Sequence, residues 1–224
     1  MTSGTTPPEP PEPTRTVVHL VRHGEVDNPE GVLYGRKPGY RLSPLGRRMA
    51  DVVAAHLEPN DVTHVVASPL ERAQETAAPI ASTHGLEIVV DERVIESENY
   101  FEGLTFGRGE GSLANPRHWP RLLNPFRPSW GEPYEAIATR MLEAIEDARR
   151  AAHGHEAVIV SHQLPVWTVR NKLAGARLWH DPRKRECTLA SLTSLLFEEE
   201  ELLSITYSEP AVELLAGAAK GAGA

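Results

Sequence analysis

Residues 16–29 read TVVHLVRHGEVDNP, a run of apolar and β-branched residues that ends in charged ones. The apolar half is typical of a buried strand. The run stops at Arg22 and His23, and Gly24 follows, a residue that allows a close turn of the backbone. A buried strand that delivers an arginine and a histidine side by side indicates a polar site at its carboxyl end.

Strand-like and helix-like segments alternate through the rest of the chain. Ser43 and Pro44 form a helix start signal, and Gly85 is a helix stop signal. Further strands are expected at 63–68, 86–90, 156–161, 189–199 and 201–208, and helices at 43–57, 69–85, 132–154 and 164–175. The alternation predicts an α/β fold, a three-layer sandwich in which helices flank a mostly parallel sheet.

The chain has 224 residues, a length typical of one large domain. Residues 1–15, rich in proline, threonine and glutamate, are expected to form a disordered tail. We expect the folded domain to span 16–208 and a flexible tail to follow at 209–224. Inside the domain, the irregular segment 96–131 predicts a lid-like insertion, because long loops in compact domains usually serve binding sites.

The composition argues against several classes of partner. The formal net charge of −8 disfavours nucleic acids and anionic membranes. No run of about 18 apolar residues is present, and the N-terminal segment lacks the apolar core of a signal peptide. Cys187 is the single cysteine, so neither an internal disulfide nor a Cys/His zinc motif is expected. These features predict a cytoplasmic protein without a membrane or metal partner, and give no clear oligomerisation signal.

Polar side chains follow three of the expected strands. Arg22 and His23 end the first strand, Arg72 comes shortly after the second, and His162 follows the strand at 156–161. The carboxyl ends of parallel strands meet at one edge of a sheet, where ligands bind. Arginine offers a planar fork of donors for phosphate oxygens, and a histidine nitrogen can attack phosphorus. The sequence therefore predicts a phosphoryl site at this edge.

Four segments together resemble the histidine phosphatase superfamily, which includes the cofactor-dependent phosphoglycerate mutases. They are LVRHGE at 20–25, LYGRKPGYRLSPLGRRMA at 33–50, SPLERAQETA at 68–77 and VSHQ at 160–163. The three motifs that carry Arg-His-Gly, Arg72 and His162 follow the order and approximate spacing of the family. The resemblance runs over most of residues 16–207.

The resemblance implies a role for each matching residue. His23 would be the nucleophile and form a phosphohistidine. Arg22 and Arg72 would grip the phosphoryl oxygens, with His162 as the second imidazole beside them. Asn28 would add a donor to the phosphoryl group, although an asparagine before a proline can also simply form a turn.

The family also uses a carboxylate shortly after the third strand to protonate the leaving oxygen. The pattern Arg-x-x-Glu in this chain points to Glu96, with Glu98 as the alternative. A solvated acidic stretch is the other reading of this glutamate-rich segment. The resemblance implies a small phosphorylated substrate and no cofactor.

Departures from the family pattern bear on the choice of function. Relatives usually carry a tryptophan before the asparagine that matches Asn28, and one more residue in that spacing, whereas this chain reads HGEVDNP. They commonly read Gly-Glu-Ser where this chain has Gly131-Glu132-Pro133. The first departure favours a metal-independent phosphomonoester hydrolase over a cofactor-dependent phosphoglycerate mutase. A non-catalytic phosphate-binding module is a third reading, but it would need only the arginines and not the pair of histidines.

Overall fold

The computed structural model describes residues 13–105, 131–181 and 184–218. Within these ranges, six strands form one sheet in the order β3-β2-β4-β1-β5-β6. The strands are β1 (Arg15–Arg22), β2 (Val62–Ala67), β3 (Ile88–Val90), β4 (Glu156–Ser161), β5 (Leu192–Glu198) and β6 (Glu201–Ser208). The first four run parallel to one another, and β5 and β6 close the sheet beside β1 in the antiparallel sense. This confirms the predicted mostly parallel sheet.

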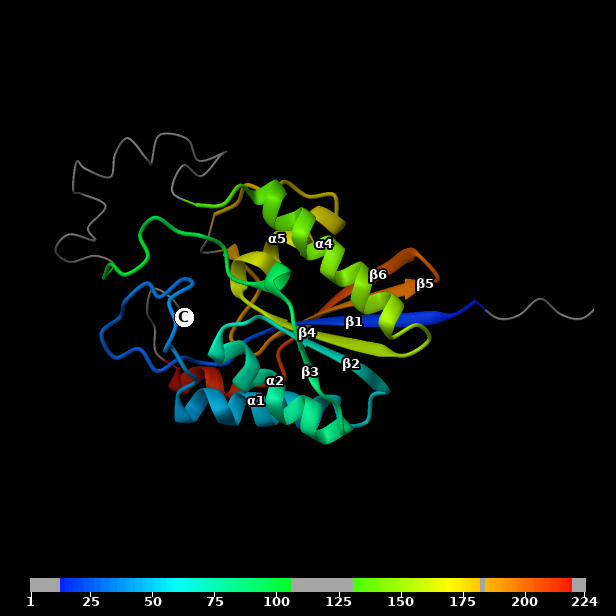
Figure 1. The fold of residues 1–224 in the computed structure, drawn as a ribbon, viewed down its shortest axis with the longest axis horizontal. Coiled ribbons are helices and arrows are strands. Elements are labelled where there is room, and N and C mark those ends of the chain that lie inside the picture. Colours follow the sequence, from blue (N-terminus) through cyan, green and yellow to red (C-terminus); the bar gives the residue numbers. More distant parts are fainter. Residues whose placement is uncertain (1–12, 106–130, 182–183, 219–224) are drawn as a thin grey trace, which may run out of the picture.

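Two pairs of helices cover the sheet, one pair on each face (Figure 1). Helices α1 (Pro44–Leu57) and α2 (Glu71–His84) pack on one face, and α4 (Tyr134–Ala151) and α5 (Gln163–Leu173) on the other. Strand β4 lies between the layers, and its apolar residues from 157 to 160 are fully buried. A strand covered on both faces reads as an unbroken apolar run, which is how β4 could be recognised in the sequence.

The helix ends follow the sequence signals closely but not fully. The Ser43 hydroxyl accepts the Gly46 N–H at 2.9 Å, and Gly85 ends α2 with a left-handed φ of 66°. Helix α2 begins at Glu71 rather than residue 69, because Leu70 is still extended. Helix α4 is shorter than the predicted 132–154, since it starts after Pro133 and ends at Ala151.

The sheet register sets the position of the site. Arg22 of β1 lies beside Ser161 of β4, and one residue earlier Val160 of β4 lies beside Ala67 of β2. Each of these strands therefore ends at the same level, with the next residues of the chain at one edge of the sheet. The loops that follow β1 and β3 meet beyond this edge, at the left of Figure 1, where Val32 and Thr105 form a bridge.

Several predicted segments lie partly outside the described residues. Of the predicted lid at 96–131, residues 106–130 lie outside them, as do residues 1–12 of the predicted N-terminal tail. In the segment predicted as a C-terminal tail, a 3-10 helix spans Val212–Gly217 and contributes leucines to the core beside α1, and 219–224 lie outside the described part. Among the described helices, none is long and apolar enough to cross a membrane.

Candidate active site

His23 follows the last residue of β1 and is 2% exposed. Its Nδ1 lies 2.7 Å from the Gly24 carbonyl oxygen. A carbonyl can only accept, so Nδ1 carries the ring proton and donates it. The lone pair is then on Nε2, which is the tautomer that a nucleophilic imidazole requires.

Gly24 holds the carbonyl that orients this ring. A Cβ at Gly24 would lie 2.5 Å from the Gly46 carbonyl oxygen, so the first turn of α1 leaves no space for a side chain there. The Gly24 N–H also donates to the Thr76 hydroxyl of α2 at 3.1 Å. Helices α1 and α2 therefore fix the backbone on which the His23 tautomer depends, and glycine is required for this close approach.

Arg22 and Arg72 are buried cations that bond to backbone carbonyls. Arg22 Nη1 donates to the Cys187 carbonyl and Arg72 Nη2 to the Gly35 carbonyl, each at 2.7 Å. Arg72 is 0% exposed, and its guanidinium lies 4.6 Å from the ring centre of Tyr34. Within the described part of the chain, Arg22 Nε and Arg72 Nε and Nη1 have no hydrogen-bond partner. Buried donors without partners are costly, so these N–H groups indicate a site for an anion.

His162 lies directly opposite the nucleophile candidate. The rings of His23 and His162 have centroids 5.1 Å apart and are inclined by 61°. His162 Nε2 is hydrogen-bonded to the Ser68 hydroxyl at 2.8 Å, whereas its Nδ1 has no partner among the described residues. The four side chains predicted to converge, two arginines and two histidines, thus form one buried cluster at the carboxyl ends of the strands, which we call the strand-end pocket.

The pocket keeps both imidazoles neutral. Burial, and then the positive charges of Arg72 and Arg22, lower the pKa of His23 well below 6.5, against the opposing effect of the Gly24 carbonyl. The pKa of His162 is also lowered well below 6.5, by burial and then by Arg72. A neutral His23 can attack at pH 7, and a dianionic phosphoryl group would offset the positive charges that disfavour a protonated His162.

The two candidate proton donors lie in different surroundings. Glu98 has a side chain that is 71% exposed and pairs with Arg36 at 3.0 Å. Glu96 is half-buried, and its Oε1 accepts the Ser97 N–H at 2.8 Å. Burial lowers the pKa of Arg72, and the Tyr34 hydroxyl and the Glu96 carboxylate oppose that shift. Of the two candidates, Glu96 is therefore the carboxylate whose charge acts on Arg72.

Asn28 is occupied within its own loop. Its Nδ2 donates to the Val32 carbonyl at 2.9 Å, and its Oδ1 accepts the Val32 N–H at 3.1 Å. These contacts match the turn-forming reading of the asparagine. To bind a phosphoryl group, the Asn28 amide would have to leave one of them.

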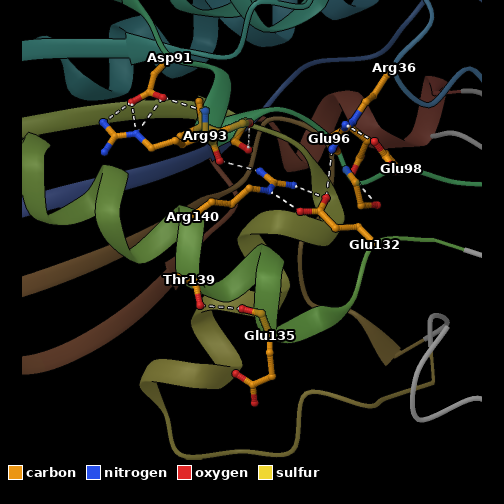
Figure 2. Close-up of polar contacts among 12 residues, drawn as sticks. Arg36, Asp91, Arg93, Glu96, Glu98, Glu132, Glu135, Thr139 and Arg140 are labelled. Carbon is orange, nitrogen blue, oxygen red and sulfur yellow. Dashed lines mark hydrogen bonds and ion pairs between the residues drawn. The ribbon is translucent and has the colours of Figure 1, made fainter.

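A charged network that the sequence did not predict holds the backbone around Glu96 (Figure 2). Glu132 Oε1 accepts a hydrogen bond from Arg140 Nε at 2.9 Å. Glu132 Oε2 accepts two more, from Arg140 Nη2 and Arg36 Nη2, at 3.0 Å each. Arg36 Nε also donates to the Glu96 carbonyl at 2.7 Å, and Arg140 Nη1 to the Arg93 carbonyl at 2.6 Å. One carboxylate, Glu132, thus orients two guanidinium groups that hold the segment 93–96 at both ends.

Three other residues of the site were missed. Ser68 follows β2 as His162 follows β4, and that equivalence was a usable signal in the sequence. Tyr34 stacks on Arg72 from within the quoted segment 33–50. The charge of Arg185, in the stretch before β5, interacts with those of Arg22 and Glu96. Nothing local in the sequence distinguishes these two from surface residues. Among the described residues, no group of three or more His, Cys, Asp or Glu side chains is arranged to hold a metal ion.

Comparison with known proteins finds a matching family and named relatives. The family model described as histidine phosphatase superfamily (branch 1) matches residues 18–209. The protein named Uncharacterized protein Rv0525 of Mycobacterium tuberculosis is 56% identical over 199 residues, which cover 89% of this chain and 98% of that protein. Probable phosphoglycerate mutase GpmB of Escherichia coli O1:K1 is 30% identical over 174 residues, 75% of this chain and 79% of that one.

A solved structure has the same fold. The mycobacterial glucosyl-3-phosphoglycerate phosphatase Rv2419c superposes with a TM-score of 0.68 at 23% identity, covering 87% of this chain and 96% of that one. The superposition confirms the predicted arrangement of a mostly parallel sheet between two helix layers.

Proposed function

This chain belongs to the histidine phosphatase superfamily and is a phosphatase-type enzyme, and we propose that it hydrolyses phosphomonoesters without a metal, through a phosphohistidine on His23. One observation carries the proposal: the lone pair of His23 Nε2 lies in a buried pocket whose arginine N–H groups lack partners among the described residues. A tetrahedral dianion would supply those partners.

In the first step, His23 Nε2 attacks the phosphorus atom of the monoester. The bond from phosphorus to the alcohol oxygen breaks, and Glu96 gives its proton to that oxygen. The negative charge on the remaining phosphoryl oxygens is met by Arg22, Arg72 and a protonated His162. Phosphoryl transfer depends mainly on such positioning and charge stabilisation, and each donor is typically worth ~3 kcal/mol in the transition state.

In the second step, water attacks the phosphohistidine. The Glu96 carboxylate takes a proton from that water as the new bond to phosphorus forms. The bond between phosphorus and Nε2 breaks, and its electron pair returns to the imidazole. Inorganic phosphate leaves, and His23 and Glu96 regain their starting protonation states. The half-buried position of Glu96 beside the pocket supports this double role, acid in the first step and base in the second.

Asn28 is proposed as an additional phosphoryl donor only in a form of the loop in which it gives up a contact with Val32. The substrate is proposed to be a small phosphorylated molecule, and no cofactor takes part. A cytoplasmic location, without nucleic-acid or membrane partners, stays a prediction from the composition and net charge.

A phosphoglycerate mutase is the second candidate, favoured by the printed name of the 30% identical relative. The missing tryptophan and shorter spacing before Asn28 argue for the hydrolase. A mutase would interconvert 2- and 3-phosphoglycerate in a reaction that depends on the bisphosphate. If this activity exceeded phosphate release on the same substrates, the hydrolase proposal would be replaced.

The direct test of hydrolysis uses p-nitrophenyl phosphate. We expect release of p-nitrophenol that is unchanged by EDTA, and at least about a 10⁴-fold loss in His23→Ala, because the covalent route is then closed. Activity that survives in a correctly folded His23→Ala protein would remove His23 as the nucleophile. Loss of activity in EDTA, restored by a divalent metal, would contradict the metal-independent reaction.

A further inference from the structure

Arg185 differs from Arg36, Arg140 and Arg170 in the partners that it binds. Arg36 and Arg140 both pair with Glu132, and Arg170 pairs with Glu186. Arg185 is half-buried, yet no carboxylate among the described residues forms an ion pair with it. Its hydrogen-bond partners are neutral: Nε donates to His180 Nε2 at 2.8 Å, and Nη1 to Gln163 Oε1 at 3.2 Å.

These neutral partners are themselves fixed. His180 Nδ1 donates to the Leu178 carbonyl at 2.6 Å, which leaves Nε2 as the acceptor for Arg185. The His180 ring also lies against Tyr134 and Trp167, with centroids 5.7 and 5.9 Å away. The guanidinium is therefore oriented in advance and keeps its full positive charge.

Arg185 is connected to the phosphoryl pocket. Gln163, which accepts from Arg185, donates its own Nε2 to the Cys187 carbonyl at 3.3 Å. The same carbonyl accepts Arg22 Nη1 at 2.7 Å. Burial lowers the pKa of Arg185, and the positive charge of Arg22 lowers it further. The negative charge of the Glu96 carboxylate is the largest effect in the opposite direction. The guanidinium thus lies within electrostatic reach of both the proposed proton donor and a phosphate-binding arginine.

An arginine in this position is costly without a bound anion. Among the described residues this partly buried cation has no ion pair and interacts with the charge of a second buried cation, so it loses hydration without gaining a counter-charge there. Arg22 and Arg72 share this property, and in their case the proposed counter-charge is the phosphoryl group. A third cation of the same kind indicates a second anionic group in the bound substrate.

We propose that Arg185 is a specificity-determining residue that binds an oxyanion, a carboxylate or a second phosphate, on the alcohol part of the substrate. This rests on the proposed function, because it takes the His23 pocket as the phosphoryl site. Glu96 is the proposed donor to the leaving oxygen and its charge acts on Arg185, so we assign Arg185 to the alcohol side of the site rather than to the transferred group. The planar fork of arginine suits either oxyanion. The substrates are then phosphomonoesters that carry a further acidic group close to the ester.

The test compares esters that differ only in that group. 3-Phosphoglycerate and glycerol 3-phosphate differ by a carboxylate in place of a hydroxymethyl group, and glucose 1,6-bisphosphate and glucose 6-phosphate differ by a second phosphate. We expect the wild-type enzyme to favour the acidic member of at least one pair by tenfold or more in kcat/KM. Arg185→Gln should remove that preference, with a 10- to 100-fold loss on the acidic ester and under about 3-fold on its neutral partner. The pair that shows the effect identifies the oxyanion.

Lys184→Gln is the matched control, because it removes an exposed positive charge from the adjacent residue. It should leave both members of each pair unchanged within about twofold, as expected for a solvated charge. An equal loss on acidic and neutral esters in Arg185→Gln would overturn the proposal and assign Arg185 to the chemical step.

Failure of this inference can be told apart from failure of the proposed function. If wild-type enzyme hydrolyses p-nitrophenyl phosphate through His23 but shows no preference within either pair, only the role of Arg185 is overturned. If it hydrolyses none of these esters, the proposed function fails first. Even if Arg185→Gln does not fold, a wild-type enzyme that shows no preference within either pair overturns the proposal.

Discussion

Two regions of this molecule use arginine in opposite ways. The strand-end pocket, formed by Arg22, His23, Arg72 and His162, keeps its cations among carbonyl groups and neutral rings. The loop rim, formed by Arg36, Arg93, Glu96, Glu98, Glu132 and Arg140, pairs each of its arginines with carboxylates. The difference separates binding from support: cations without a carboxylate partner in the described part of the chain are available to a substrate, whereas paired ones hold the backbone.

The two regions also rest on different parts of the fold. The pocket side chains lie at the end of β1 or shortly after β1, β2 and β4, whose register places their ends at one level of the sheet. The rim lies on the loops after β1 and β3 and on the start of α4. A rigid sheet can hold buried charges that would be unfavourable in a mobile segment, because the cost is met by the packed core around it.

The largest contrast is expected between an arginine of the pocket and one of the rim. Arg72→Ala removes unpaired donors and a buried charge, so kcat/KM for p-nitrophenyl phosphate should fall about 10³-fold. Arg93→Ala breaks partly exposed pairs with Asp91 and Asp147 and should cost under about 3-fold. Steady-state kinetics with circular dichroism of each variant measures the contrast. Losses of similar size in two folded variants would erase the distinction between the regions.

A smaller loss of activity should follow when the ion pairs of the loop rim are weakened. Glu132→Gln weakens the hold of Arg36 and Arg140 on the segment that carries Glu96, and so displaces the proton donor. Esters with poor leaving groups need that proton most. We expect kcat/KM to fall 10- to 30-fold for glycerol 3-phosphate but under about 3-fold for 2,4-dinitrophenyl phosphate, a partial loss of general acid catalysis.

Two further variants serve as references for the activity of Glu132→Gln. Glu96→Gln should show the same dependence on the leaving group with a larger loss. Glu98→Gln also removes a carboxylate from Arg36, but an exposed one, and should have little effect. A uniform loss on good and poor leaving groups in Glu132→Gln would mean that this residue supports the fold without positioning the acid.

The smallest effect concerns stability and pH. The pKa of His162 is lowered in the folded protein by burial and then by Arg72, whereas an unfolded histidine titrates near 6.5. The unfolded chain therefore binds protons that the empty pocket does not, and stability is lost as pH falls below about 6.5. Each such histidine costs up to about 1.4 kcal/mol per pH unit below that value.

Urea unfolding between pH 7.5 and 5.5 tests this expectation. In His162→Asn the free energy of unfolding should depend less on pH than in the wild-type protein. The difference should correspond to the uptake of up to one proton on unfolding. His56→Asn, which changes an exposed histidine, is the control for the substitution itself. If the free energy of unfolding had the same slope against pH in the wild-type and His162→Asn proteins, this would contradict a neutral, buried His162.

The strand-end pocket could be predicted from the sequence because each residue follows an apolar run that reads as a strand. Parallel strands then bring Arg22, Arg72 and His162 together without any knowledge of side-chain contacts. The motifs that carry these residues also indicated the family, since they occur in the order that the histidine phosphatase superfamily shows. For the same reason, the sheet and its two helix layers were predicted correctly.

The loop rim could not be predicted because its contacts join residues far apart in the chain. Glu132 bonds to Arg36 across 96 positions, and nothing in the local pattern marks that pair. The choice between Glu96 and Glu98 likewise depends on burial, which neighbouring glutamates in one segment do not reveal. Asn28 shows the opposite problem, because its local role as a turn former competes with the role implied by the family.

The central claim, that His23 Nε2 and the surrounding cations act on one phosphorus atom, is tested most directly by trapping the intermediate. Enzyme mixed with a phosphomonoester and quenched in base should carry one phosphoryl group on His23, stable in base and lost in acid. His23→Ala should carry none. A phosphoryl group on another residue, or turnover in a folded His23→Ala protein with no covalent label, would contradict this account.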